Sequence, residues 1–185
     1  MTRARRRRAR GLEQLSFDLA SPPPRWQFSR LVLRTPHVTR IRERLDFVRG
    51  FFPELDAISI RVGLAQKRGV LGWGSLDPER PGIWVRPRRL DFFTVAHEMT
   101  HLLQARGLVP RGERACDLWA LARSPLLVDS APGYLRVPEH LQRVRIGTAV
   151  ARFLHRAAQR ALAARAGGDR RYLLSFEEEV ARQLP

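Results

Sequence analysis

The stretch Asp91-Phe-Phe-Thr-Val-Ala-His-Glu-Met-Thr-His-Leu-Leu-Gln-Ala-Arg106 decides the fold, because it predicts a helix that carries both apolar and chemically active residues. Asp91 can cap the start of this helix, and Gly107 follows its end. One stripe of the helix is apolar and faces a core, formed by Phe92, Ala96, Met99 and Leu103. Another stripe groups Thr94, His97 and His101. The helix therefore has a packing face and a polar face.

The polar face carries the pattern His97-Glu98-x-x-His101, which is typical of a metal site. Residues four apart lie on one side of a helix, so the two imidazoles can share a tetrahedral zinc ion. Glu98 lies about 100° round the helix from His97, where it can accept a proton from a zinc-bound water molecule. The alternative is a buried histidine pair without a metal, which would need other polar partners.

A zinc site needs a third protein ligand, and the next predicted helix supplies candidates. This helix is Gly112-Glu-Arg-Ala-Cys-Asp-Leu-Trp-Ala-Leu-Ala122, in which Glu113 and Asp117 stand four residues apart. We expect Glu113 to complete a His₂Glu site and Asp117 to bind the distal nitrogen of a histidine. The alternative is that both carboxylates are solvated surface charges.

The combined pattern, His-Glu-x-x-His followed by Glu-x-x-x-Asp, resembles the gluzincins, the thermolysin-like clan of zinc metallopeptidases. The short spacing is most similar to the minimal members called minigluzincins, over about residues 36–135. The resemblance implies zinc ligands His97, His101 and Glu113, the general base Glu98, and Asp117 as the residue that orients His97. The asparagine that often precedes the ligand glutamate in thermolysin relatives is Gly112 here.

The resemblance also implies features that no motif in this chain identifies. Gluzincins use a tyrosine or a histidine to stabilise the oxyanion, and Tyr134 and His140 follow the site closely enough to take that role; the alternative is a structural role for both. In the reduced zincin core the last strand lies along the cleft, and substrate peptides pair with it as a further strand. The resemblance implies that Ile83–Arg86 is this strand here. SprT-like proteases share the strand–helix core, but their third ligand is a histidine.

The remaining sequence predicts an α+β protein rather than a parallel βαβ fold, because a helix and three short strands precede a run of helices. The predicted helices cover 36–52, 91–106, 112–122, 138–166 and 172–183, and the strands cover 57–65, 70–75 and 82–86. We expect a minimal zincin-like core with a helical C-terminal extension. That core comprises a helix, a three-stranded sheet, the HExxH helix and the glutamate helix.

Composition divides the chain into three parts. Residues 1–25 form a basic arm that ends in the stiff proline run Pro22–Pro24. We expect residues 26–135 to form the zincin-like catalytic domain that the resemblance implies, and residues 136–185 to form the helical basic extension.

Charge is the most unusual bulk property. Lysine and arginine number 34 against 18 acidic residues, which gives a net charge of +16. Residues 1–10 contribute +6 and residues 135–171 contribute +7 of this excess. The predicted helix 138–166 is amphipathic, with a basic side formed by Arg145, Arg152, Arg156 and Arg160. This layout predicts nucleic-acid contact through arm 1–10 and helix 138–166, and the alternative is a solvated arginine surface.

Two functions from different classes follow. The first is a zinc metalloendopeptidase that hydrolyses peptide bonds in peptide or protein substrates by a zinc-bound water activated by Glu98. The alternative is a nucleic-acid-associated zinc protein, either SprT-like or non-catalytic, that uses its basic flanks. The single cysteine, Cys116, excludes an internal disulfide framework. No apolar run reaches the ~18 residues of a membrane span, so we expect a soluble cytoplasmic protein.

Overall fold

The protein has an α+β architecture in which helices line up beside one small sheet. The strands are β1 (Trp26–Phe28), β2 (Ile60–Leu64), β3 (Gly72–Gly74) and β4 (Gly82–Val85); the helices are α1 (Arg30–Arg34), α2 (Val38–Arg49), α3 (Phe92–Ala105), α4 (Glu113–Arg123), α5 (Thr148–Ala166) and α6 (Tyr172–Gln183). The computed structural model describes residues 24–65, 72–142 and 144–184. The α+β class predicted from the sequence is confirmed.

Within the described residues the sheet has four strands in the order β1-β2-β4-β3, one more than the sequence predicts. Strands β1, β2 and β4 run parallel, and β3 pairs antiparallel with β4. The sequence does not indicate β1, because three residues are too few to show an alternating pattern. The expectation that Ile83–Arg86 lies along the cleft is wrong, since Ile83–Val85 belong to β4, which lies between β2 and β3 inside the sheet. The edge strand next to α3 is β3.

Helices α2 and α3 pack on one face of the sheet. Alternate residues of β2 and β4 point to this face and are fully or almost fully buried, namely Ile60, Val62, Ile83 and Val85. They share one apolar cluster with Ile41 and Leu45 of α2 and with Val95 and Met99 of α3. Burial of this kind is the main favourable contribution to folding, at about 25 cal/mol per Å² of apolar surface.

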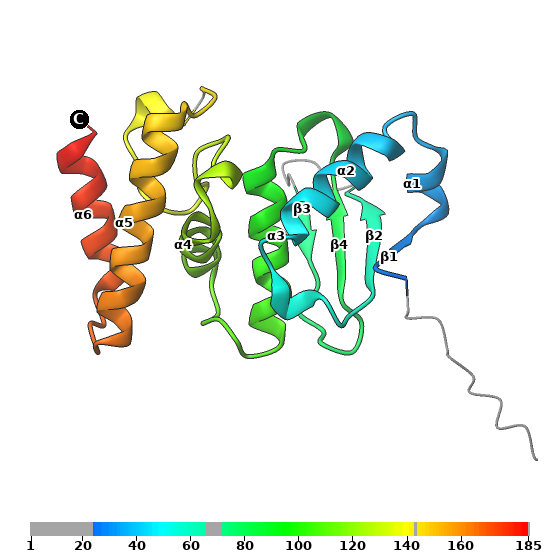
Figure 1. Ribbon diagram of the computed structural model, residues 1–185, viewed down its shortest axis with the longest axis horizontal. Coiled ribbons are helices and arrows are strands. Elements are labelled where there is room, and N and C mark those ends of the chain that lie inside the picture. Colours follow the sequence, from blue (N-terminus) through cyan, green and yellow to red (C-terminus); the bar gives the residue numbers. More distant parts are fainter. Residues whose placement is uncertain (1–23, 66–71, 143, 185) are drawn as a thin grey trace, which may run out of the picture.

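The C-terminal helices continue the same core. Figure 1 shows α3, α4, α5 and α6 following one another away from the sheet. Helix α4 lies between α3 and α5, and the apolar cluster runs without interruption from Val32 in α1 to Val180 in α6. No helix in the described ranges is both long enough and apolar enough to cross a membrane.

The long C-terminal helix begins later than the sequence predicts. Pro138 precedes only a single 3₁₀ turn, Glu139–Leu141, and α5 begins at Thr148 after an extended Gly147. The intervening chain is held by tertiary contacts: Ile146 is buried, and its backbone N–H donates to the carbonyl of Asp129 at 3.2 Å. These contacts are not local in sequence, so helical periodicity alone places the start ten residues too early.

The N-terminus of α3 is capped from a distance. Asp91 occupies the N-cap position but makes no side-chain capping hydrogen bond. The backbone N–H groups of Phe92 and Phe93 instead donate to the two carboxylate oxygens of Asp129, each at 3.1 Å. Asp129 thus satisfies two free donors of the helix and places a negative charge at the positive end of its dipole.

We predict that Asp129→Ala lowers the free energy of unfolding by about 1–2 kcal/mol, because two helix N–H groups lose their acceptors. The matched control is Asp91→Asn, which changes the neighbouring carboxyl without removing a capping bond. Denaturant unfolding of both variants measures the effect. Equal stability of Asp129→Ala and wild type would contradict the capping role.

Candidate metal centre

Helix α3 holds three ionisable side chains in mostly buried positions. His97 and Glu98 are buried, and His101 is half-buried. The sheet approaches the helix closely here: a Cβ added to Gly74 of β3 would lie 2.6 Å from His101 Cβ and 2.8 Å from the Glu98 carbonyl oxygen. Only glycine permits this contact, so β3 runs directly against the turn of α3 that bears the polar residues.

Helix α4 brings a carboxylate to both histidines. Glu113 Oε2 lies 3.0 Å from His97 Nε2 and 3.2 Å from His101 Nε2. For zinc bonds of ~2.0–2.1 Å, the ligand atoms of a tetrahedral site stand about 3.3–3.4 Å apart. Glu113 Oε2 therefore stands from each of the two Nε2 atoms at nearly the spacing that two ligands of one zinc ion require, which is compatible with the predicted ligand set of His97, His101 and Glu113.

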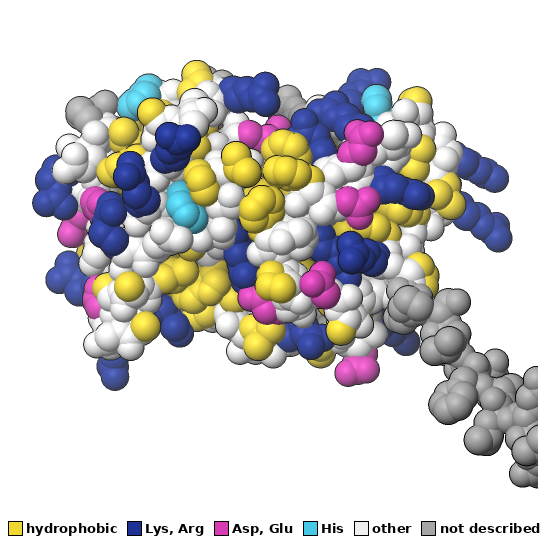
Figure 2. All heavy atoms as spheres, in the orientation of Figure 1, with side chains coloured by type: hydrophobic (Ala, Val, Ile, Leu, Met, Phe, Trp, Pro, Cys, Tyr) yellow, Lys and Arg dark blue, Asp and Glu magenta, His cyan; other side chains and the backbone are white. Residues whose placement is uncertain are grey.

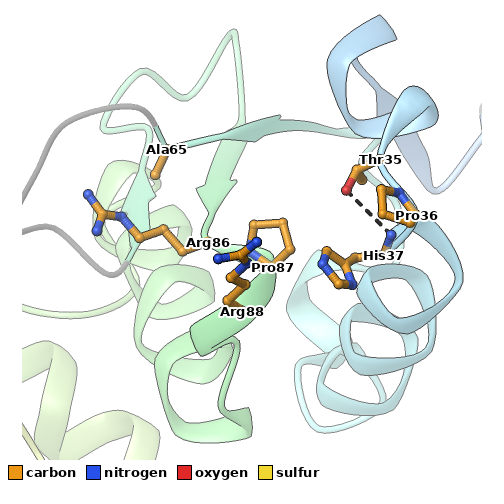
Figure 3. Close-up of a pocket in the computed structure, with 7 residues that line it drawn as sticks. All are labelled: Thr35, Pro36, His37, Ala65, Arg86, Pro87 and Arg88. Atoms are coloured by element: carbon orange, nitrogen blue, oxygen red, sulfur yellow. Dashed lines mark hydrogen bonds between the residues drawn. The ribbon is translucent and has the colours of Figure 1, made fainter.

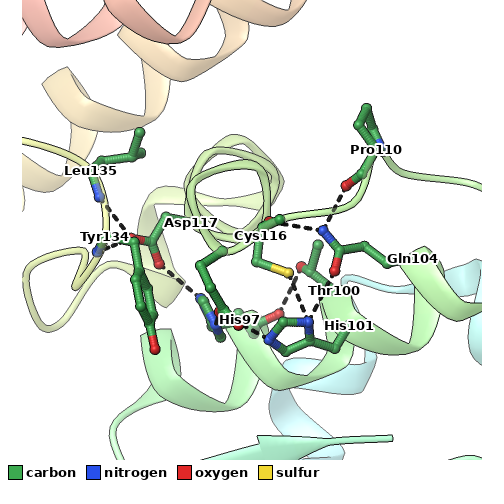
Figure 4. A network of polar contacts seen from close by, with 12 residues as sticks. His97, Thr100, His101, Gln104, Pro110, Cys116, Asp117, Tyr134 and Leu135 are labelled. Carbon is green, nitrogen blue, oxygen red and sulfur yellow. Dashed lines mark hydrogen bonds and ion pairs between the residues drawn. The ribbon is translucent and has the colours of Figure 1, made fainter. Parts of the chain in front are cut away.

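Asp117 fixes the orientation of His97 (Figure 4). Its Oδ1 accepts a hydrogen bond of 2.8 Å from His97 Nδ1, so Nε2 is the nitrogen that faces Glu113. Burial lowers the pKa of His97, but the hydrogen bond and the charge of Asp117 outweigh it and raise that pKa overall.

Gln104 fixes the orientation of His101. Its amide N–H₂ donates to the carbonyls of Pro110 at 2.6 Å and Gly112 at 2.9 Å, which leaves the amide oxygen facing the ring. His101 Nδ1 lies 3.0 Å from that oxygen and donates to it. The Nε2 atom of His101 then carries a lone pair toward Glu113. The sequence does not indicate this role of Gln104, because its partners lie across a turn.

Cys116 offers a second candidate for the third ligand. The ligand atoms of His97, His101 and Cys116 all lie within 4.8 Å of one another, so these three residues form a group that can hold a metal ion. Cys116 Sγ is 3.2 Å from Nδ1 of His101, however, whereas Glu113 faces Nε2 of the same ring. A single ring cannot direct both nitrogens at one ion. Burial and the nearby carboxylates raise the pKa of the Cys116 thiol, so the thiol is protonated as long as no cation lies beside it.

Glu98 has an unusual environment for a carboxylate. Glu98 is only 5% exposed, and its Oε2 atom is buried with no hydrogen-bond partner among the described residues. Burial is the largest cause that raises the pKa of Glu98 to about 7, assisted by Glu113 and opposed by His97 and by a hydrogen bond from the Gly74 backbone. A buried carboxylate with one free oxygen is well suited to accept a proton.

The two residues considered for oxyanion stabilisation lie in different places. Tyr134 is at the site: its ring stacks on His97 with centroids 5.6 Å apart, and its backbone N–H donates to Asp117 Oδ2 at 2.6 Å. The pKa of Tyr134 is raised, first by burial and then by the neighbouring carboxylates. His140 is exposed in the 3₁₀ turn Glu139–Leu141, and within the described chain no hydrogen bond, ion pair or ring contact joins it to the site. The structure thus brings together all the predicted site residues except His140.

A separate hollow of about 700 Å³ lies at the start of α2, where the end of β2 meets the segment after β4 (Figure 3). It is lined by Thr35, Pro36, His37, Ala65, Arg86, Pro87 and Arg88. None of the predicted site residues lines it. His37, for which the sequence indicates no role, donates its backbone N–H to Thr35 Oγ1 at 3.3 Å there.

The arginine-rich segments are only partly described. The basic arm 1–10 lies outside the described residues, as does most of the predicted arm 1–25. On α5, Arg152, Arg156 and Arg160 are exposed, and Arg160 pairs with Glu179 of α6. Figure 2 shows arginine side chains spread over the visible face rather than gathered in one patch.

Comparison with known proteins adds no identification. No protein-family profile matches the chain, and neither the curated proteins nor the solved structures yield a significant match. Functional interpretation therefore depends on the geometry of the side chains.

The two candidates for the third ligand lead to opposite predictions. We expect Glu113→Ala to weaken zinc binding at least ~100-fold, since even outer partners of zinc ligands contribute about 10–100-fold. We expect Cys116→Ala to leave zinc binding close to that of wild type. Elemental analysis and titration against a chelating dye measure zinc binding by both variants. The control is Glu139→Ala, which replaces an exposed carboxylate. Full zinc binding by Glu113→Ala together with loss in Cys116→Ala would make the thiol the ligand.

Proposed function

We propose that the protein is a zinc-dependent metallopeptidase of gluzincin type. The observation that carries this proposal is the convergence of Glu113 Oε2 on the Nε2 atoms of His97 and His101, at 3.0 and 3.2 Å. Two neutral imidazole nitrogens and a carboxylate oxygen are all lone-pair donors, and such a set is stable at this spacing only with a proton or a cation among them.

The donor set favours zinc in a catalytic rather than a structural role. His97, His101 and Glu113 would hold the ion, and two histidines with one glutamate leave a fourth position open, whereas structural zinc sites are closed by four protein ligands. A zinc ion bound there supplies Lewis-acid activation of water and of a substrate carbonyl. Asp117 and Gln104 keep the two imidazoles in the tautomers that direct Nε2 at the ion.

The remaining site residues supply proton transfer and charge stabilisation. Glu98 would accept a proton from the attacking water and donate it to the leaving amine, since its free oxygen and raised pKa suit both directions of transfer. Tyr134 would donate its hydroxyl proton in a hydrogen bond to the oxyanion, because its ring already stacks on His97.

A peptide substrate is favoured by the position of β3. This strand is the edge of the sheet and runs against α3 at Gly74. An extended peptide can add to such an edge through backbone hydrogen bonds, and this placement would bring its carbonyl groups past α3. The edge strand β3 would thus take the role that the resemblance to zincins implies for Ile83–Arg86.

A second candidate function is supported by charge. The net charge of +16 and the exposed arginines on α5 favour contact with nucleic acid, which would make the protein a zinc protein associated with DNA or RNA. The two functions are compatible, since the arginines of α5 and the proposed zinc ligands lie on different helices.

Replacement of Glu98 tests the peptidase. We predict that Glu98→Gln lowers the rate of protein hydrolysis by about 10²–10⁴, because the amide cannot accept the proton. Zinc content and melting temperature should stay near wild type, since Glu98 is not a proposed ligand. The assay is hydrolysis of an unfolded protein substrate that a chelator abolishes and zinc restores. A Glu98→Gln protein as fast as wild type would remove the peptidase assignment.

Salt dependence tests the second function. We predict that affinity for duplex DNA falls as salt rises, and that Arg152→Ala with Arg156→Ala reduces the log–log slope by about 1.8 if each arginine contacts one phosphate. The matched control is Arg30→Ala with Arg34→Ala on α1, which removes the same charge at the other end of the molecule (Figure 1). Absence of binding near 50 mM salt, or an equal change in both double variants, would leave the α5 arginines as a solvated surface.

A further inference from the structure

Helix α6 carries a buried carboxylate that the proposed chemistry does not use. Glu177 is only 5% exposed. Its Oε1 accepts a hydrogen bond of 2.9 Å from the backbone N–H of Arg136, and the guanidinium of Arg114 lies 2.8 Å from the same oxygen. A buried carboxylate is unfavourable unless it is paired, so these two contacts account for its position.

Both partners of Glu177 adjoin residues of the metal centre. Arg114 follows Glu113 in the first turn of α4. Arg136 follows Tyr134 and Leu135, whose backbone N–H groups donate to Asp117 Oδ2 at 2.6 and 3.1 Å. One oxygen atom on the C-terminal helix thus joins the start of the glutamate helix to the segment that bears the tyrosine.

We infer that Glu177 is a positioning residue for the metal centre, through which α6 holds Glu113 and Tyr134 in register with α3. This inference rests on the proposed function, since it assigns Glu113 as a metal ligand. The extension after residue 136 is then a part of the site rather than an appendage. Without Glu177, the first turn of α4 and the segment 134–136 lose a shared anchor, and the carboxylate of Glu113 is no longer held opposite the two imidazoles.

Apolar contacts keep α6 in place when Glu177 is replaced. Phe176 and Val180 of α6 are buried in the main core. The ring of Tyr172 packs edge-on against Trp119 of α4, with the ring centroids 6.2 Å apart. A Glu177 variant is therefore expected to fold. Its defect should be local to the site.

The experiment compares zinc affinity in four full-length proteins: wild type, Glu177→Ala, Glu177→Gln and Glu178→Ala. Glu178 is the exposed neighbour on the same helix and serves as the matched control. Affinity is measured by competition with a chelating dye, and the metal-free melting temperature is recorded for each protein. We expect Glu177→Ala to bind zinc about tenfold more weakly, at the lower limit of the effect of outer partners of metal ligands. Glu177→Gln keeps an acceptor oxygen and should recover most of the affinity.

The outcomes separate this inference from the proposed function. A purely structural Glu177 would lower the metal-free melting temperature and leave zinc affinity within about twofold of wild type, which would overturn the inference alone. Equal loss in Glu177→Gln and Glu177→Ala, or an equal loss in Glu178→Ala, would also overturn it. A wild-type protein that binds no zinc would remove the metal centre itself, and the positioning role with it.

Discussion

The arrangement of the site depends on one buried carboxylate. Asp117 accepts three hydrogen bonds, from the Nδ1 atom of His97 and from the backbone N–H groups of Tyr134 and Leu135. These donors belong to helix α3 and to the loop that bears Tyr134. A carboxylate that is 1% exposed must keep its partners, because an unpaired buried charge would be costly by several kcal/mol. Asp117 therefore fixes the imidazole, the tyrosine and the helix α4 relative to one another.

The rest of the fold holds helices α3 and α4 at a fixed spacing. Helix α3 is buried on nearly all sides: the sheet contacts it at Gly74, α4 lies alongside it, and Asp129 caps its first turn. Helix α4 is held in turn by α5 and by the ion pair between Arg114 and Glu177. Catalytic and metal sites require side chains to be held within fractions of an ångström, and support on both sides of a helix pair provides that restraint.

The position of the C-terminal helices changes how the extension is interpreted. Composition suggests a basic appendage after residue 136, since arginines dominate there. In the structure, the buried side of α5 and α6 belongs to the same apolar cluster as the sheet, and the arginines face outward. One amphipathic helix can have both a charged surface and a face that packs in the core. The extension therefore completes the apolar core with one side and exposes its arginines on the other.

The sequence by itself determined the features that depend on local spacing. The helix around His97 and the second helix around Glu113 follow from residues that recur three and four apart on one helix face. The pairing of Asp117 with His97 joins two helices, and only the resemblance to gluzincins indicates it before the structure places the two side chains together. The tertiary structure alone decided which distant residues meet. It placed β3 rather than Ile83–Arg86 at the edge of the sheet, Asp129 rather than Asp91 at the start of α3, and Tyr134 rather than His140 beside the histidines. Helical periodicity repeats over a few residues, whereas these contacts depend on how whole elements pack, and no local pattern encodes that packing.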